Sequence, residues 1–570
     1  MKRYDRWKGV AAALCSVGFV AACGGGNSSD APTSRTTHLG VVEGARDAGQ
    51  GTLSWKGIPF AQPPVGALRW RAPVEPAAWA TARDATRFGQ ACLQNGRLYG
   101  PGANNTYDAT IATTLNTPVG SEDCLTLNVW RPDGDADKLP VIVFVYGGSN
   151  ISGFTADPVY DGAALAKAAN AVVVTVNYRV GPLGFFNLAQ LKEGASAEEA
   201  SGNFALLDVM QALRFVKKNA TVFGADAGNV TLMGQSAGAI NVWALVASPA
   251  AAGLFHKAVP LSGGISLASN LPKGAIATLN PATTYAAQAN ALLARLLVAD
   301  GRAADMTAAA TAVAGMGAAE VATYLRGKDG KQLLSTLLAS GLTGSGPIPD
   351  GTVLPADPIS AMAAGKYNRM PVLAGVTADE GKLFAPFLPL LGGPAGFVMN
   401  DADRFKLMMN YRPDAPAATA IGDIIHPYYL PADTAATGWN ARTAMIGNGL
   451  FGLSRDNVLN TLKTQQDKVW AYDFRWAQQP APWNTIYGAA HAFDLPFLFG
   501  NFGPSLFANV TNSTANKPGR LALSGAMMAS LGAFARTGDP NNAGLGRTWQ
   551  GWPSRLVFDA TQTQAVIGAQ

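Results

Sequence analysis

The segment of residues 230–247 constrains the fold of this chain more than any other part of the sequence. A short strand-like run, Val-Thr-Leu-Met at 230–233, leads directly into Gly-Gln-Ser-Ala-Gly at 234–238, and residues 237–247 have the character of a helix. The pattern G-x-S-x-G between a strand and a helix is typical of a sharp turn that holds its serine in a strained conformation with the hydroxyl exposed. The sequence therefore predicts that Ser236 is a nucleophile at the edge of a sheet.

Continuous apolar runs indicate the kind of sheet. Residues 141–146 and 171–176 are mostly β-branched and do not alternate, as in strands that helices cover on both faces. Apolar residues at 203–222 recur at helical spacing. Strands that alternate with helices predict an α/β fold with a mostly parallel central sheet and helices on both faces. Further strand-like runs lie at residues 52–60, 125–130, 258–261, 371–376 and 469–474.

Residues 275–342 differ from the rest of the chain. They are rich in alanine, poor in aromatic residues and free of a clear strand. We therefore expect a helical insertion over the sheet that forms a cap or lid on the active site. A separate helical domain is the alternative, although no linker flanks the segment.

Composition and charge narrow the functions open to the chain. It has 570 residues, of which 48% are hydrophobic and 14% charged, which is a globular composition. Four basic residues among the first eight supply most of the net charge of +5, and no dense run of lysine and arginine follows. Nucleic-acid binding therefore has no electrostatic basis in this sequence.

The N-terminus is typical of an export signal. A basic start is followed by an apolar run at residues 9–22, which is shorter than the roughly 20 residues that span a membrane. We predict a signal peptide at 1–22, a flexible tether at 23–37 and one large domain at 38–570. Small residues before Cys23 and a Gly/Ser stretch after it are similar to a bacterial lipoprotein site, at which Cys23 would carry a lipid anchor.

This interpretation implies an exported bacterial protein that is periplasmic, secreted or associated with the outer membrane through its lipid. An ordinary signal peptide cleaved nearby is the alternative. Cys15 lies in the predicted signal peptide, so Cys92 and Cys124 are the cysteines of the large domain. In an oxidising compartment they are expected to form a disulfide that closes a loop of about 30 residues. Two buried free thiols are the alternative.

A serine nucleophile needs a base, and the chain has only four histidines. In serine turns of this kind the acid and then the histidine follow the serine along the chain. This order excludes His38 and leaves little room for an acid before His256. His491 lies in a loop of small residues after the run at 469–474, so we predict that it is the base. His426, beside a proline where a helix ends, is the alternative.

The acid that orients the histidine is less sharply defined. Glu380 and Asp379 both follow the strand-like run at 371–376. Their spacing does not separate them, and Asp350 is a further candidate.

Backbone donors for a tetrahedral intermediate are expected in Tyr-Gly-Gly-Ser-Asn at 146–150. This turn directly follows a predicted strand and is rich in glycine, as oxyanion turns are. An ordinary Gly-Gly turn is the alternative.

Several further segments share the patterns of one enzyme family. They are Phe-Gly-Ala at 223–225 with the run at 230–238, Ser-Glu-Asp-Cys-Leu-Thr-Leu-Asn-Val-Trp at 121–130, Lys-Gly-Ile-Pro-Phe-Ala at 56–61 and Arg-Thr-Gly-Asp-Pro-Asn at 536–541. Together they resemble the type-B carboxylesterase family, which also contains the cholinesterases and bile-salt-activated lipases. The resemblance spans roughly residues 40–560 and implies the α/β-hydrolase fold.

The resemblance implies roles for particular residues. Glu380, in an Asp-Glu-Gly setting, would be the acid and His491 the base. Cys92 and Cys124 would form the family's first disulfide, and Ser262 would be a hydroxyl close behind the catalytic residues. The backbone N–H groups that would bind the oxyanion are those of Gly148, Ser149 and Ala237.

Departures from the family pattern bear on the substrate. Gln235 stands where cholinesterases commonly have Glu, and their cation-binding Trp has no evident counterpart. Without a negative charge beside Ser236, we expect neutral esters rather than choline esters. Ser149 replaces the third glycine of the oxyanion turn, and Ala225 replaces a glycine of the nucleophile signature.

The expected activity is hydrolysis of small neutral carboxylate esters by a monomer, through a covalent acyl-enzyme on Ser236. No cofactor is needed, and no metal site is expected, because the histidines are scattered and no HExxH motif occurs. A lipase or polyester hydrolase that acts on bulky apolar esters is the nearest alternative. A non-catalytic adhesion or binding lipoprotein is the alternative from another class.

Overall fold

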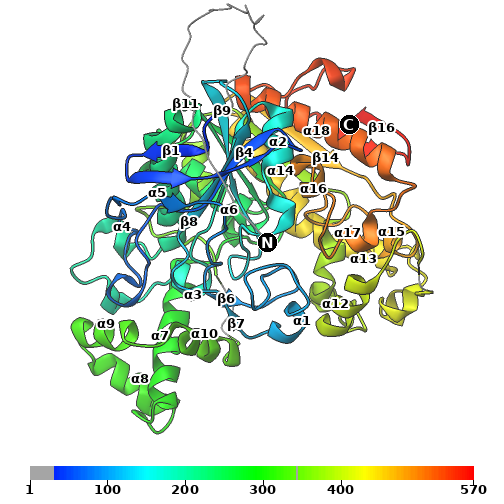
Figure 1. Cartoon of the computed structure of the whole chain (residues 1–570). Helices are drawn as coiled ribbons and strands as arrows, with labels where there is room; N and C mark the ends of the chain where they lie inside the picture. The colour runs from blue at the N-terminus through cyan, green and yellow to red at the C-terminus, as the bar shows by residue number, and fades with distance from the viewer. Residues whose placement is uncertain (1–30, 342–344, 417) are drawn as a thin grey trace, which may run out of the picture.

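The computed structural model describes residues 31–341, 345–416 and 418–570. The predicted signal peptide at 1–22 and the proposed anchor Cys23 lie outside the described residues. Within the described ranges an eleven-stranded sheet forms the centre of the molecule (Figure 1). In spatial order its strands are β16 (Ala565–Ala569), β15 (Arg555–Ala560), β14 (Val469–Phe474), β13 (Val372–Thr377), β12 (Lys257–Leu261), β11 (Ala225–Gln235), β9 (Leu139–Val145), β10 (Val172–Val176), β8 (Thr126–Pro132), β4 (Thr52–Pro59) and β3 (Ala45–Asp47).

The strands in the middle of this sheet, from β10 across to β15, all run parallel to their neighbours. Antiparallel pairs lie at the two edges, where β8 joins β10 and β16 joins β15. Every residue of β9 and β10 is buried, because helices cover both faces of the sheet. The prediction of a mostly parallel sheet in an α/β fold is confirmed.

Helices from distant parts of the chain form the two outer layers. On one side α5 (Phe204–Asn219) and α6 (Ala237–Ala247) are buried along nearly their whole length. On the other side α2 (Ala163–Ala169), α16 (Leu495–Phe499) and α18 (Lys517–Thr537) pack against one another. Over the part of the chain that the structure describes, no helix is both long and apolar enough to cross a bilayer.

The alanine-rich segment is helical, as predicted, and Figure 1 shows its helices as a group beyond one end of the sheet. Arg69 ties this group to the rest of the protein. Its guanidinium donates to the carbonyls of Leu325 (2.9 Å) and Lys328 (2.8 Å) and to the carboxylate of Glu122 (2.6 Å). The helices are α7 (Ala282–Ala299), α8 (Met306–Gly315), α9 (Ala318–Arg326) and α10 (Gly330–Ala339).

Part of the segment that the sequence predicts as a flexible tether belongs to a strand. Residues Ser34–Thr37 form β1, which pairs antiparallel with β2 (Gly40–Glu43). The predicted tether at 23–37 therefore extends too far, and the domain starts before residue 38. The polar Ser-Arg-Thr-Thr sequence has no apolar alternation, and its strand is defined by hairpin pairing that composition does not reveal.

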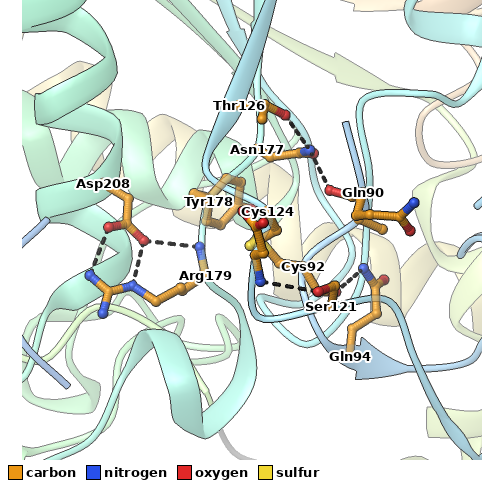
Figure 2. Close-up of a disulfide and its surroundings, with 12 residues drawn as sticks. Gln90, Cys92, Gln94, Ser121, Cys124, Thr126, Asn177, Tyr178, Arg179 and Asp208 are labelled. Atoms are coloured by element: carbon orange, nitrogen blue, oxygen red, sulfur yellow. Dashed lines mark hydrogen bonds and ion pairs between the residues drawn. A yellow bond between two sulfur atoms is a disulfide. The ribbon is translucent and has the colours of Figure 1, made fainter. Parts of the chain in front are cut away.

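Cys92 and Cys124 form a disulfide, with their Cα atoms 4.9 Å apart (Figure 2). Both residues are buried, and the bond closes a loop that ends just before β8. Beside the bond, the Asn177 side chain donates to the carbonyl of Gln90 (3.0 Å). The disulfide and this contact hold the two ends of the loop against the sheet.

Replacing Cys92 and Cys124 together by serine is expected to lower the free energy of unfolding by about 3–4 kcal/mol. The chain-entropy model gives roughly this value for a closed loop of this length. Chemical denaturation followed by circular dichroism checks it, and the midpoint should fall while the native spectrum stays the same. An unchanged midpoint would mean that the bond contributes no stability.

Candidate active site

Ser236 occupies the sharp turn between β11 and α6 that the sequence predicted. Its backbone has φ 58° and ψ −123°, a conformation that L-residues rarely adopt and that costs about 1–3 kcal/mol. The Ser236 N–H donates to the carbonyl of Leu261 at the end of β12 (2.8 Å), which fixes the turn to the neighbouring strand. The side chain is partly exposed and lines a cavity of about 670 Å³.

His491 lines the same cavity and has polar contacts on both ring nitrogens. Its Nδ1 forms a short hydrogen bond with Oε2 of Glu380. Because the Nδ1–H donates to this carboxylate, Nε2 of the neutral ring carries the lone pair that can accept a proton. The side-chain amide nitrogen of Gln235 lies 3.0 Å from Nε2 and donates to that lone pair.

The two neighbouring carboxylates that spacing left unresolved have different partners. Glu380 is buried at the start of the 3₁₀ segment η7 (Glu380–Leu391), and its second oxygen accepts the N–H of Thr377 (2.8 Å). Asp379 instead accepts the backbone N–H of Ala489 (2.9 Å). The structure thus brings Glu380, and not Asp379, to the imidazole of His491. Asp350 accepts backbone N–H groups of its own turn, including that of Leu354 (2.9 Å).

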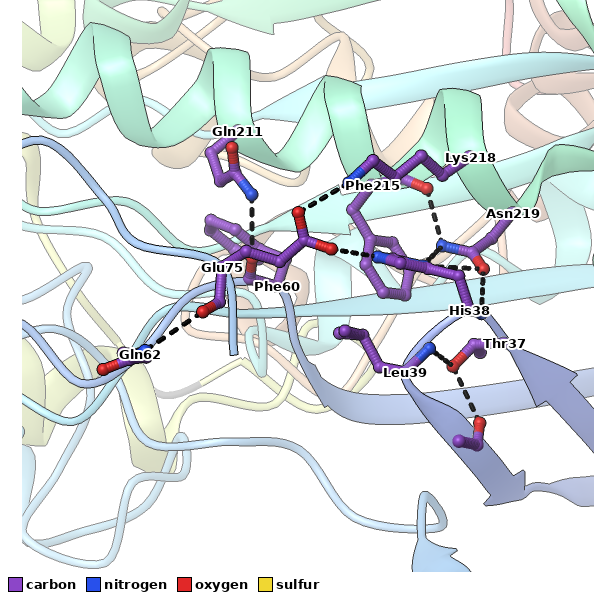
Figure 3. Close-up of polar contacts among 11 residues, drawn as sticks. Thr37, His38, Leu39, Phe60, Gln62, Glu75, Gln211, Phe215, Lys218 and Asn219 are labelled. Atoms are coloured by element: carbon purple, nitrogen blue, oxygen red, sulfur yellow. Dashed lines mark hydrogen bonds and ion pairs between the residues drawn. The ribbon is translucent and has the colours of Figure 1, made fainter. Parts of the chain in front are cut away.

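The other histidines occupy structural positions. His38 contacts Asn219 and Glu75 close to the N-terminal hairpin (Figure 3). Nδ1 of His256 accepts the backbone N–H of Val230 in β11 (3.1 Å). His426 caps the beginning of the short 3₁₀ helix η9 (Pro427–Tyr429), where its Nδ1 accepts the N–H of Tyr428. The sequence interpretation placed His426 at the end of a helix, whereas it begins one.

The expected oxyanion donors lie on two sides of Ser236. Gly148 and Ser149 have φ of 111° and 58°, so the turn after β9 departs from the extended strand at once. A Cβ on Gly147 would lie 2.8 Å from the Cβ of Ser236, so this turn packs directly against the serine. Ala237 is the first residue of α6, and its N–H has no partner within the helix. The positive end of the α6 dipole therefore points toward the serine.

Ser262 stays a prediction. It directly follows β12, its N–H donates to the carbonyl of Gly375 (2.7 Å), and it has a φ of 51°. Its hydroxyl is buried and has no polar partner among the described residues.

Aromatic rings around His491 were missed by the sequence analysis. Phe384 packs edge-on against the imidazole with ring centroids 4.9 Å apart, and Phe451 lies 4.4 Å away at an interplanar angle of 33°. Phe451 belongs to a π-helical turn, η10 (Asn448–Gly452), a geometry that is frequent at functional sites. Phe384 follows Glu380 closely enough to have been a candidate, but nothing in the sequence marked Phe451.

A buried carboxyl group behind the site was also missed. Asp494 accepts the hydroxyl of Tyr472 (2.7 Å), and burial raises the pKa of this carboxyl to about 6. Asp494 follows His491 by only three residues, but its position in the sequence is that of an ordinary loop carboxylate and does not indicate a role at the site.

The cavity is largely apolar, and most of its walls come from outside the helical insertion. Within the described part of 275–342, Asn280 lines it, so the role of this segment as a cap stays a prediction. Among the residues that the structure describes, no group of three or more His, Cys, Asp or Glu side chains is arranged to hold a metal ion. The aromatic residues that line the cavity are Tyr99, Tyr107, Tyr160, Phe384, Phe387, Trp476, Phe493, Phe497, Phe502 and Phe507.

Known proteins are similar to this chain over nearly its whole length. Residues 31–565 match the model of the Carboxylesterase family. The chain is 31% identical over 520 residues to the para-nitrobenzyl esterase of Bacillus subtilis (strain 168), covering 91% of this chain and 92% of that protein. It is 32% identical over 526 residues to the fumonisin B1 esterase of Sphingopyxis macrogoltabida, covering 91% and 84%. A solved PNB esterase structure superposes with a TM-score of 0.70 at 28% identity, over 94% of this chain and 97% of that one.

These matches narrow the alternatives. Both relatives are esterases by name. The comparisons therefore do not favour a lipase or polyester hydrolase, and they do not favour a non-catalytic adhesion or binding lipoprotein. Membership of an esterase family implies small-molecule ester substrates. The chain belongs to the carboxylesterase family, and it is a serine hydrolase of carboxylic esters.

Proposed function

We propose that Ser236 is the nucleophile of this esterase, His491 its general base and Glu380 the acid that orients the base. The observation that carries the proposal is the bond between Nδ1 of His491 and the buried Glu380 carboxylate, beside a strained serine on the same cavity. This bond selects the tautomer in which Nε2 can take a proton from a hydroxyl.

The proposed reaction has two acyl-transfer steps. Ser236 attacks the ester carbonyl while its proton passes to Nε2 of His491. His491 then protonates the leaving alcohol, and in the second step it activates the water that releases the acid and restores Ser236. Glu380 stabilises the imidazolium that forms in each step. The oxyanion is bound by the backbone N–H groups of Gly148, Ser149 and Ala237.

Gln235 acts on the base rather than on the ester in this proposal. Its amide occupies the lone pair of Nε2 at rest (3.0 Å), so the Ser236 hydroxyl must replace it before proton transfer. The amide is buried and neutral, and it therefore adds no charge that would hold His491 in the imidazolium form.

The proposed substrates are neutral esters with a substantial apolar group. The aromatic walls of the cavity favour apolar surface, which is the main contribution to binding in such sites. Its charged lining residues are two of each sign, so the cavity favours neither anionic nor cationic esters overall. These residues are Arg97, Arg404, Asp157 and Asp401.

Cellular location and assembly form a further part of the proposal. We propose that residues 1–22 direct export, that Cys23 carries a lipid anchor to the outer membrane, and that a monomer is active. The basic and apolar N-terminal sequence supports export, and the small residues before Cys23 support lipidation. The helices of 275–342 are proposed to act as a cap.

Ser236→Ala is expected to reduce kcat for p-nitrophenyl esters by about six orders of magnitude, as for the loss of a triad serine. Hydrolysis across an acetate-to-palmitate series measures it and also gives the preferred acyl length. Ser335→Ala, an exposed serine on α10, is the matched control and should keep full activity. Full activity in Ser236→Ala would contradict the assignment.

Glu380→Gln is expected to lower kcat by about 10³–10⁴, because a neutral amide no longer selects the required tautomer or stabilises the imidazolium. Steady-state kinetics of the purified variant measure the change. If kcat changed less than tenfold, another group would have to orient His491.

Gln235→Glu is expected to move the acid limb of the kcat/KM profile to higher pH by about one unit. A carboxylate at this position would favour the protonated imidazole, which cannot act as a base. Activity would then be lost at a higher pH than in the native enzyme. Gln235→Met, which adds no charge, is the control, and an identical profile for Gln235→Glu would contradict the proposed contact with His491.

A further inference from the structure

Two adjacent carboxylates follow β13, and only one of them contacts the imidazole. Asp379 turns to the loop that carries His491. Its Oδ2 accepts the N–H of Ala489 (2.9 Å), and its own N–H donates to the Ala489 carbonyl (2.9 Å). Asp379 and Ala490 are also bridged in parallel β fashion. The Asp379 backbone and side chain thus both hold the chain one to two residues before His491.

The other Asp379 oxygen pairs with a lysine that has almost no solvent exposure. Nζ of Lys382 lies 3.1 Å from Oδ1 of Asp379, and the Lys382 side chain is 5% exposed. Burying an ammonium group is costly unless a charged partner compensates for the lost hydration. The pair therefore fixes the Asp379 carboxylate in the orientation that receives Ala489.

The loop fits this pair closely. Gly488 has a φ of 53°, and a Cβ there would lie 2.4 Å from Oδ2 of Asp379 and 3.1 Å from Nζ of Lys382. The Gly488 carbonyl accepts the side-chain amide of Gln479 (2.8 Å). The loop is therefore held from two sides, and glycine is the residue that lets it approach the ion pair.

We propose that Asp379 and Lys382 form a clamp that positions His491 through the backbone of residues 488–490. Both are positioning residues, since they act through the loop and do not line the cavity. The inference rests on the proposed role of His491 as the base. It gives the two adjacent carboxylates separate roles. Glu380 orients the imidazole ring, and Asp379 orients the backbone that carries the ring.

The clamp should affect turnover and leave ester binding unchanged. The loop residues Gly488, Ala489 and Ala490 are small and both alanines are fully buried, so the hydrogen bonds to Asp379 add a directional restraint to the packing of the loop. A displacement of about 1 Å at a reacting group can lower a rate about a hundredfold. Loss of the clamp would therefore reduce the fraction of enzyme with His491 in reach of Ser236.

The test compares Asp379→Ala, Asp379→Asn and the double variant Asp379→Asn/Lys382→Met in p-nitrophenyl butyrate hydrolysis. Active sites are counted by the burst of p-nitrophenol, so that unfolded enzyme does not enter kcat. Asp379→Ala should lose at least tenfold in kcat with KM changed less than twofold. The double variant keeps an amide oxygen for Ala489 and leaves no unpaired charge, so it should recover most of the activity lost in Asp379→Asn alone.

A matched control is available on the surface. Asp403 and Lys406 have the same i, i+3 spacing with their charged atoms 3.9 Å apart, and both are well exposed. Asp403→Ala should leave kcat unchanged.

Three outcomes would overturn the clamp. The first is a native kcat in Asp379→Ala. The second is a change of KM in Asp379→Ala as large as the change of kcat. The third is a double variant that is no more active than Asp379→Asn. If Ser236→Ala also stayed active, the proposed function itself would fail. An inactive Ser236→Ala beside a fully active Asp379→Ala would refute only the clamp.

Discussion

The strained turn at Ser236 is the constraint on which the rest of the structure depends. A residue with φ 58° and ψ −123° costs about 1–3 kcal/mol, and it persists only where its surroundings fix it on both sides. Here the buried strand β11 precedes it and the buried helix α6 follows it. The large α/β core thus holds one hydroxyl in a position that a short peptide would not maintain.

The parallel direction of the central strands places the other candidate site residues after strands of the same sheet. The turn at Gly148 follows β9, Ser236 follows β11, Glu380 follows β13 and His491 follows β14. Since carboxyl ends of neighbouring parallel strands meet at one edge of a sheet, residues more than 200 positions apart in sequence line one cavity. The disulfide between Cys92 and Cys124 closes a loop that completes another part of this cavity wall.

The sequence predicts best those features that depend on interactions between residues close together along the chain. Strand–turn–helix at Ser236, the apolar runs of the parallel strands and the helical character of the insertion all depend on local pattern, and each appears in the structure. Spacing alone did not separate Glu380 from Asp379, because both follow the same strand and differ only in which partner each side chain reaches. The resemblance to a family favoured Glu380, and the geometry agrees with that choice.

Other features depend on contacts between distant segments, which one sequence does not show. Phe451 reaches His491 through a π-helical turn, and Lys382 is buried by its pairing with Asp379. The strand at Ser34–Thr37 exists because a hairpin pairs it, although its composition is that of a linker. Packing in three dimensions decides these cases, and local propensity does not.

Covalent labelling tests the central claim most directly. The native enzyme would be treated with a p-nitrophenyl alkylphosphonate, which mimics the tetrahedral intermediate, and the modified peptide would be mapped by mass spectrometry. The account predicts one adduct per chain, located on Ser236, with loss of activity in proportion to labelling. Inactivation with the adduct on any other residue would contradict the account.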